Sequence, residues 1–259
     1  MQTVLFHETV FGPIHSRRLG TSLGVNLSPR DGKVCSFDCL YCEAGFNAQG
    51  PGTTGLPSRT EVRELLEEKL AAMKAAGSGL DVITFSGNGE PTLHPDFEGI
   101  IDDTIALRDK YFPEVKISVL SNSTCLTREG VDRALRRVDN NILKLDSALT
   151  TSVRSIDRPN SREFTADKAI ADISRFGGQC VVQTMILRGV APDGAVIDNT
   201  TPEEVDALIE AYKKIGPRQV MLYSIDRKTP AEHLQKVERD ELLDIASRIS
   251  AAGINVTVS

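Results

Sequence analysis

The sequence alternates between short apolar runs and longer stretches of helical periodicity, and this alternation constrains the fold more than any other feature. Continuous apolar runs, rather than alternating ones, are typical of strands buried on both faces of a parallel sheet. Six helical stretches separate the seven runs, as in successive βα units. The runs are SLGVNLS (22–28), DVITFSG (81–87), VKISVLS (115–121), NILKLD (141–146), QCVVQTMIL (179–187), QVMLYSI (219–225) and INVTVS (254–259).

Start signals mark several of the helices. Ser58 and Glu61 form a capping box, and Thr201 and Glu204 form a second one. His94 precedes a proline at another helix start, where we interpret its side chain as a cap rather than a base. The remaining helices are expected to begin at Thr127 and to lie near 163–176 and 237–251.

These units predict an α/β fold, and their number favours a partial (β/α)6 barrel of parallel strands over a doubly wound sheet. In either fold the loops at the carboxyl ends of the strands carry the functional site. We predict a single domain over residues 1–259, in which residues 1–20 form a short N-terminal extension. Residues 31–57 form a long loop after the first strand, which carries three cysteines and then becomes glycine-rich.

The composition excludes a disordered chain and argues against several kinds of partner. Of the 259 residues, 40% are hydrophobic and 25% are charged, which is enough to bury a sizeable core. A net charge of -6 provides no overall positive field for nucleic acid or anionic lipid. No apolar run approaches the roughly 20 residues that span a bilayer, and the N-terminus lacks the pattern of a signal peptide. We therefore expect a cytoplasmic protein without a membrane partner.

Cys35, Cys39 and Cys42 stand in the spacing C-x3-C-x2-C after the first strand, and this is the strongest chemical signal in the sequence. Thiolates suit zinc and iron–sulfur clusters, and a structural zinc site normally takes four ligands. Three cysteines that hold a [4Fe–4S] cluster leave one iron without a protein ligand, open to a small molecule. The alternative is a zinc knuckle completed by His7 or His15.

The motif C-x3-C-x-aromatic-C, in which Tyr41 is the aromatic residue, resembles the signature of radical S-adenosylmethionine (SAM) enzymes. The resemblance implies a [4Fe–4S] cluster held by the three cysteines, with SAM bound at the open iron through its methionyl amino and carboxylate groups. In that family an electron from the cluster cleaves SAM to methionine and a 5'-deoxyadenosyl radical, which abstracts hydrogen from a substrate. The resemblance also implies a one-electron donor such as a ferredoxin or flavodoxin.

The resemblance extends to residues that end the later strands. The segment FSGNGEPTLHP (85–95) lies where the family has a Gly-Gly-Glu motif for the SAM amino group, with an asparagine between the glycines here. Glycines let the backbone approach a ligand, and a cation needs carbonyl or carboxylate partners. The resemblance further implies that Tyr41 borders the adenine. The expected SAM pocket consists of Tyr41, Gly87, Asn88, Gly89, Glu90, Ser121, Asn122, Lys144 and Asp146.

Within the family, the segments GPIHSRRLGTSLGVNLSP (12–29), KVCSFDCLYC and LKLDSA resemble the branch of tRNA wyosine-base synthases and their bacterial relatives. Those synthases carry upstream cysteines for a second cluster, but no cysteine precedes Cys35 here, and Cys125 and Cys180 are expected to be buried side chains. Together with the negative charge, this favours a small-molecule or peptide substrate over tRNA. The alternatives are tRNA base modification and a non-catalytic iron–sulfur or zinc protein.

Four arginines have no assigned role: Arg17, Arg18, Arg154 and Arg158. A guanidinium in such a position either anchors an anionic substrate or forms ion pairs within the protein. The sequence leaves both interpretations open.

Overall fold

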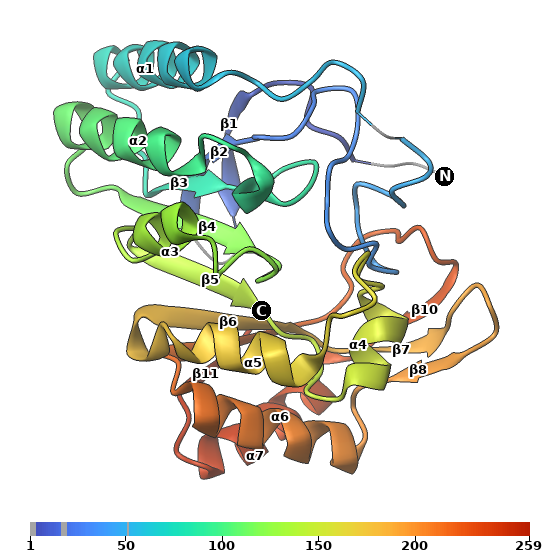
Figure 1. Ribbon diagram of the computed structural model, residues 1–259. Coiled ribbons are helices and arrows are strands. Elements are labelled where there is room, and N and C mark those ends of the chain that lie inside the picture. Colours follow the sequence, from blue (N-terminus) through green and yellow to red (C-terminus); the bar gives the residue numbers. More distant parts are fainter. Residues whose placement is uncertain (1–3, 17–19, 51) are drawn as a thin grey trace.

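A curved sheet of eight strands forms the centre of the computed structural model, which describes residues 4–16, 20–50 and 52–259 (Figure 1). At one edge, β1 (Val10–Ser16) pairs antiparallel with β2 (Gly20–Val25). From β2 onward all neighbouring strands run parallel. Across the sheet, β2 is followed by β3 (Val82–Phe85), β4 (Lys116–Ser121), β5 (Asn140–Lys144), β6 (Cys180–Met185), β9 (Gln219–Tyr223) and β11 (Val256–Val258).

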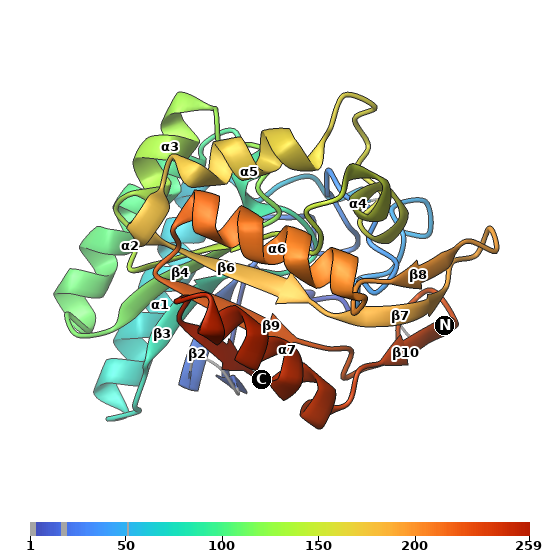
Figure 2. The same ribbon diagram turned by 90° about the horizontal axis from the view of Figure 1, so that it is seen from below.

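Helices cover the outer face of this sheet (Figures 1 and 2). They are α1 (Arg59–Ala75), α2 (Phe97–Tyr111), α3 (Glu129–Leu135), α5 (Ala166–Ser174), α6 (Pro202–Ile215) and α7 (Arg239–Ala251), with the short turns η1 (Pro91–Leu93) and η2 (Gly177–Gln179). Helix α4 (Thr150–Ile156) instead places Ile156 in a second apolar cluster, with Leu187 and Ile197. Each parallel strand before β11 is followed by a helix, which confirms the predicted α/β fold with six βα units. Within the described residues, no helix is both long and apolar enough to cross a membrane.

Several helix boundaries follow the signals in the sequence, but α3 begins at Glu129 with Arg128 as its N-cap, and Thr127 does not cap it as expected. Ser58 Oγ accepts a hydrogen bond from the Glu61 backbone N–H at 3.2 Å, and Thr201 caps α6 in the same way. His94 Nδ1 accepts a hydrogen bond from the Asp96 N–H at 3.1 Å immediately before α2, in agreement with a capping role. These side chains satisfy backbone donors that the first helical turn leaves unpaired, and so fix where the helices begin.

The two faces of the sheet differ in chemistry. On the outer face, alternate strand residues such as Leu23, Ile83 and Leu143 pack against the helices in one apolar core. On the inner face, polar side chains of strands hydrogen-bond in pairs at 2.8, 2.9 and 3.1 Å. These pairs are Ser22 with Thr84, Asn140 with Ser118, and Gln219 with Thr257. Buried apolar side chains such as Ile142 and Val181 lie on the same face, so the inner face of the barrel is mixed in polarity.

The sequence patterns do not predict β1, α4 or a separate antiparallel sheet of three short strands. That sheet has the order β10 (His233–Lys236), β7 (Leu187–Val190), β8 (Val196–Asp198) and lies beyond the carboxyl ends of the parallel strands, near α4 (Figure 1). The apolar run 179–187 conceals a strand boundary, because Ile186 N–H bonds to the Tyr223 carbonyl and the chain then enters the second sheet. Helix α4 has seven residues and no side-chain cap, so it carries no start signal.

Candidate functional site

The cysteine loop, residues 33–45, lies at the carboxyl ends of the parallel strands and is held on both sides by backbone hydrogen bonds. On one side, Val34 N–H donates to the Asn88 carbonyl at 3.2 Å and the Val34 carbonyl accepts from Glu90 N–H at 3.0 Å. On the other side, Leu40 N–H donates to the Ile156 carbonyl at 2.9 Å, at the end of α4. The loop is therefore fixed between the end of β3 and α4.

The three cysteines of this loop are partly exposed and form no disulfide. Burial raises the pKa of the Cys35 thiol to about 11 and raises the pKa of Cys39 well above its usual value. The charge of Cys42 contributes to both shifts, so the three side chains lie within electrostatic range of one another. Without a metal, Cys35 and Cys39 therefore favour the neutral thiol, and a metal that binds them must displace their protons.

Three thiols without a fourth ligand fit a [4Fe–4S] cluster with one open iron better than a single zinc ion. Among residues 4–16, 20–50 and 52–259, no three His, Cys, Asp or Glu side chains, the three cysteines included, are grouped as ligands of one ion. His15 pairs with Thr21 at the amino end of β2, opposite to the end that leads to the cysteines. His7 Nδ1 lies 3.0 Å from the Arg30 carbonyl oxygen. Neither position supports the zinc knuckle that the sequence leaves open.

Gly89 and Gly87 are required by close packing beside the cysteine loop. A Cβ at Gly89 would overlap the Val34 carbonyl oxygen and would lie 2.8 Å from Ser28 Oγ. Gly87 has a φ of +145°, and a Cβ there would overlap the Asn26 side chain. In this structure the absence of a side chain at the two glycines lets the cysteine loop and Asn26, which directly follows β2, pack closely against the end of β3.

We predict that Gly89→Ala displaces the cysteine loop, because the added methyl group meets backbone atoms of Val34 that a side-chain rotation cannot move. The expected cost is about 1–3 kcal/mol of unfolding free energy, typical of overpacking, together with a lower iron content after reconstitution. Urea unfolding and iron analysis would measure both. Gly79→Ala is the matched control, since a Cβ at Gly79 meets nothing within 4 Å. Equal iron content in the two variants would contradict this account of Gly89.

The Asn88 side chain joins this turn to the N-terminal segment. It is fully buried, and its Nδ2 donates to the carbonyls of Phe6 and Pro29 at 2.8 and 3.0 Å. Its Oδ1 accepts from the Phe6 N–H at 2.8 Å. Because the amide is occupied by the protein, any contact of Asn88 with a ligand would come from its backbone.

Glu90 is a buried carboxylate that organises the adjacent end of β4. Its Oε1 accepts hydrogen bonds from Thr92 N–H at 3.0 Å and from Ser121 Oγ at 2.9 Å, and its Oε2 accepts one from Asn122 N–H at 2.6 Å. Burial raises the pKa of Glu90, and these hydrogen bonds oppose the rise. A carboxylate oxygen has about two acceptor positions. The described part of the chain gives Oε2 one donor, so one position remains for a ligand cation.

Asn122 contacts a cysteine directly. Its Nδ2 lies 3.5 Å from Cys35 Sγ and donates to Ser36 Oγ at 2.9 Å, and its Oδ1 accepts from Thr124 Oγ1 at 2.7 Å. Hydrogen bonds to the sulfur ligands are one of the features that tune an iron–sulfur cluster. The structure therefore places this pocket residue beside a thiol.

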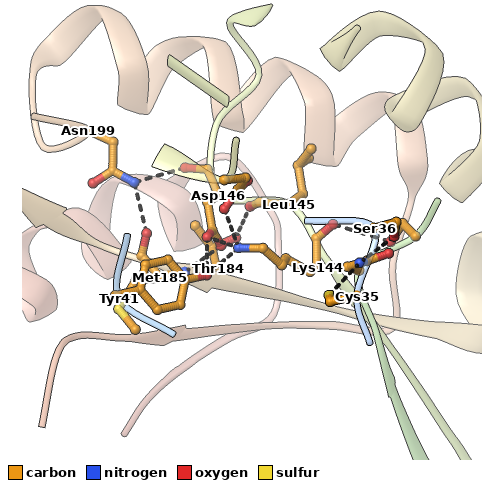
Figure 3. Close-up of polar contacts among 12 residues, drawn as sticks. Cys35, Ser36, Tyr41, Lys144, Leu145, Asp146, Thr184, Met185 and Asn199 are labelled. Atoms are coloured by element: carbon orange, nitrogen blue, oxygen red, sulfur yellow. Dashed lines mark hydrogen bonds and ion pairs between the residues drawn. The ribbon is translucent and has the colours of Figure 1, made fainter. Parts of the chain in front are cut away.

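Lys144 is the centre of a buried ionic group at the end of β5 (Figure 3). Its ammonium contacts the Asp146 carboxylate and the Tyr41 hydroxyl, and Nζ lies 2.6 Å from Asp157 Oδ1. The Tyr41 hydroxyl donates to Asp146, and the ammonium lies 4.7 Å from the centre of the Tyr41 ring. Asp146 is fully buried and also accepts from the Met185 N–H at 2.9 Å. This group links the cysteine loop to β5 and to the residues that end α4 and β6.

One ammonium faces two carboxylates in this group. Burial raises the pKa of Asp157 to about 8; Lys144 opposes the rise and Asp146 adds to it. Burial disfavours the charged form of Lys144, but the two carboxylates outweigh it and raise the pKa of Lys144 well above its usual value. Lys144 thus keeps its positive charge, and the raised pKa of Asp157 means that its charge depends on pH near neutrality.

We predict that Asp157 makes the protein less stable as pH rises. Its pKa is raised from 3.8 to about 8, so between these values the folded chain holds a proton that the unfolded chain has released. Unfolding free energy therefore falls with rising pH across this window, by up to about 1.4 kcal/mol per pH unit for one proton. Urea unfolding from about pH 5 to about pH 8 should show a smaller fall for Asp157→Asn. Parallel curves for the variant and the unchanged protein would refute this assignment.

A cavity of about 870 Å³ opens beside the cysteine loop. Cys42 and Gly45 line one wall, and residues between 225 and 236 line the other. The two walls are joined by an ion pair between Arg227 and Glu43 at 2.5 Å. The volume of the cavity lies within the range of roughly 300–1,000 Å³ that ligand pockets occupy. The cavity therefore connects a cysteine of the loop with solvent.

Two buried charged residues of the site have partners that the sequence does not predict. Lys33 stands in the cysteine loop itself, and a lysine two positions before the first cysteine is the signal that could have found it. Asp157 reaches Lys144 only because α4 turns the chain back, and α4 has no signal.

The four arginines whose roles the sequence leaves unassigned fall into two groups. Arg17 and Arg18 lie outside the described residues. Arg154 donates to the Phe164 carbonyl at 2.9 Å, and Arg158 lies 3.8 Å from Asp38. For this second pair the structure supplies contacts within the protein.

Comparison with known proteins identifies relatives along most of the chain. The model of the Radical SAM superfamily matches residues 31–197. The UPF0026 protein of Helicobacter pylori is 30% identical over 238 residues, which cover 90% of this chain and 71% of that protein. A Brachyspira hyodysenteriae protein named GTPase Obg is 29% identical over 255 residues, 97% of this chain. This chain spans only 35% of that protein's length, so nothing of its name is carried over.

Solved structures share the fold at low sequence identity. A radical SAM methyltransferase from Sphaerobacter thermophilus has a TM-score of 0.68 at 17% identity, covering 92% of this chain and 65% of that one. A structure of TYW1 with a lysine-pyruvate adduct bound has a TM-score of 0.58 at 14% identity, covering 90% and 75%. At these identities the similarity shows the fold alone.

Proposed function

The chain belongs to the radical SAM superfamily, and from this membership we propose that it binds a [4Fe–4S] cluster through Cys35, Cys39 and Cys42. When bound, the cluster would supply the electron that cleaves SAM to methionine and a 5'-deoxyadenosyl radical. A ferredoxin or flavodoxin would supply that electron in turn. The substrate from which hydrogen is taken is a small molecule or a peptide.

One observation carries this proposal: three thiols without a fourth ligand lie beside a carboxylate with a free acceptor position. The cysteine loop is seated on the turn that follows β3, and Glu90 ends that turn. An ammonium group of a ligand bound next to the loop can pair with Glu90 Oε2 and with backbone carbonyls of Gly87 and Gly89. This is the arrangement that the SAM methionyl group requires.

The other pocket residues would act in two ways. Ser121 and Asn122 hold the Glu90 carboxylate in place through the hydrogen bonds described above. Tyr41, Lys144 and Asp146 would border the rest of SAM. Lys144 would be the fixed cation, and Asp146 would hold the Lys144 ammonium and the Tyr41 hydroxyl in place. Burial of this ionic group keeps water from the inner end of the site, as radical chemistry needs.

The substrate would approach through the cavity beside Cys42, which carries both acidic and basic side chains. We propose that residues 1–259 form one radical SAM domain, a unit that the longer relatives contain. Free thiols at the site suit the reducing cytoplasm.

Modification of a tRNA base is the second candidate, because TYW1 shares the fold. A net charge of -6 opposes it, since tRNA binding draws on basic residues. Filter binding of tRNA at low and high salt would decide: steeply salt-dependent binding would favour tRNA.

The proposed function is tested by product analysis. Anaerobically reconstituted protein, incubated with SAM and dithionite, is expected to form 5'-deoxyadenosine and methionine in equal amounts. Samples without reductant and samples loaded with zinc are the controls and should form neither product. Absence of 5'-deoxyadenosine from protein with a full complement of iron would reject SAM cleavage.

A further inference from the structure

The ammonium group of Lys33 is enclosed by the cysteine loop. Its side chain is 1% exposed, and Nζ donates to the Gly45 carbonyl at 2.9 Å. Lys33 precedes Cys35, and Gly45 follows Cys42 and is bonded to it through backbone N–H and carbonyl at 2.9 Å. The lysine side chain therefore connects the two ends of the loop that carries all three thiols.

This buried charge is incompletely paired within the protein. An ammonium has three donors, and the described residues provide one hydrogen bond, to Gly45. Within residues 4–16, 20–50 and 52–259, its one carboxylate partner is Asp38, whose Oδ1 lies 3.7 Å from Nζ, beyond hydrogen-bond length. Asp38 is also shared, because it accepts from Asn47 N–H at 2.6 Å and pairs with Arg158 at 3.8 Å. A buried cation in this state needs further negative charge.

The loop itself provides that charge once its thiols become thiolates. Cys42, Cys35, Cys39 and Asp38 all lie within electrostatic range of the Lys33 ammonium. Three thiolates give a [4Fe–4S] group one net negative charge when oxidised and two when reduced. A fixed cation nearby stabilises the reduced form more, because attraction grows with the opposing charge.

We propose that Lys33 is the counter-charge of the cluster and raises its reduction potential, which eases electron entry from the donor. This inference rests on the proposed function. Lys33 is thereby a positioning residue that acts on the cluster through its charge. Its ammonium also keeps its hydrogen bond to the Gly45 carbonyl, which joins the two ends of the cysteine loop. The closest alternative is a purely structural link across the loop.

Redox titration followed by electron paramagnetic resonance distinguishes these roles. Lys33→Met keeps the length of the side chain and removes the charge, so its midpoint potential should be more negative. The ratio of reduced to oxidised cluster at a fixed potential should fall at least about tenfold, equivalent to 59 mV for one electron. Lys33→Arg, which keeps the charge, should shift less, and Lys168→Met, at an exposed lysine paired with Asp172, should not shift.

Each outcome decides the matter. A Lys33→Met protein with full iron and an unchanged potential would overturn the proposal, as would equal shifts in the Met and Arg variants. A Lys33→Met chain that does not fold would show that the link to Gly45 is structural, and would also overturn it. If the unchanged protein forms no [4Fe–4S] cluster, the proposed function fails first, before any potential is measured.

Discussion

Replacement of Cys35, Cys39 or Cys42 by alanine, one at a time, is expected to abolish formation of 5'-deoxyadenosine. Each cysteine supplies one of three thiolates, and residues 33–45 contain no other cysteine and no histidine to replace it. A cluster that loses one of three ligands is not retained in a form that leaves a single iron open. Iron and sulfide analysis, the absorbance of the cluster, and product assay under anaerobic conditions would measure the loss.

Cys125→Ala and Cys180→Ala are the matched controls. Both cysteines are buried, and Cys180 Sγ donates to the Gly177 carbonyl at 3.2 Å, so these changes affect packing rather than ligation. They should retain iron and product formation, with some loss of stability. SAM cleavage that survives any one of the three loop substitutions would reject the ligand assignment.

Lys144→Met is expected to cause the largest loss of stability among single changes outside the cysteine loop. It leaves two buried carboxylates, Asp146 and Asp157, without their cation, and removal of one partner from a buried ion pair typically costs about 3–5 kcal/mol. This loss of unfolding free energy should grow from about pH 5 to about pH 8. A buried carboxylate without its cation avoids the cost of burying a charge only by binding a proton, and protons become scarcer as pH rises. Urea unfolding of the metal-free protein would measure it.

The double variant Lys144→Met with Asp157→Asn tests the cause. Removal of the second carboxylate should restore part of the lost free energy, because one uncompensated charge disappears with it. Lys168→Met removes an exposed lysine paired with Asp172 and should cost at most about 0.5 kcal/mol. A loss in Lys144→Met no larger than in Lys168→Met would show that the ionic group has little energetic weight.

Most of the parallel sheet could be predicted, and the reason is visible in particular strands. The run around Ile83 and the run around Val182 are buried on both faces, so their sequences are continuously apolar and easy to find. The second sheet could not be found in this way. Its strands β7, β8 and β10 have three or four residues each and lie partly in solvent, so they carry no long apolar pattern.

The site was predictable where it depends on local motifs. Cys35, Cys39 and Cys42 share one short segment, and the residues that end β3, β4 and β5 meet them because parallel strands place their carboxyl ends together. The contacts of Asp157 and Lys33 depend on the path of α4 and on how the loop closes at Gly45. The path of α4 has no sequence signal, and Lys33 has only its position two residues before Cys35, so the partners of these two charges emerge only from the three-dimensional structure.

The most direct test of the account is electron paramagnetic resonance of the reduced, iron–sulfur reconstituted protein with and without SAM. We predict a [4Fe–4S] signal whose shape changes when SAM is added, because SAM would bind the iron that the three cysteines leave open. A signal that does not respond to SAM, or zinc in place of iron at the cysteine loop, would contradict the proposed function and the pocket built on it.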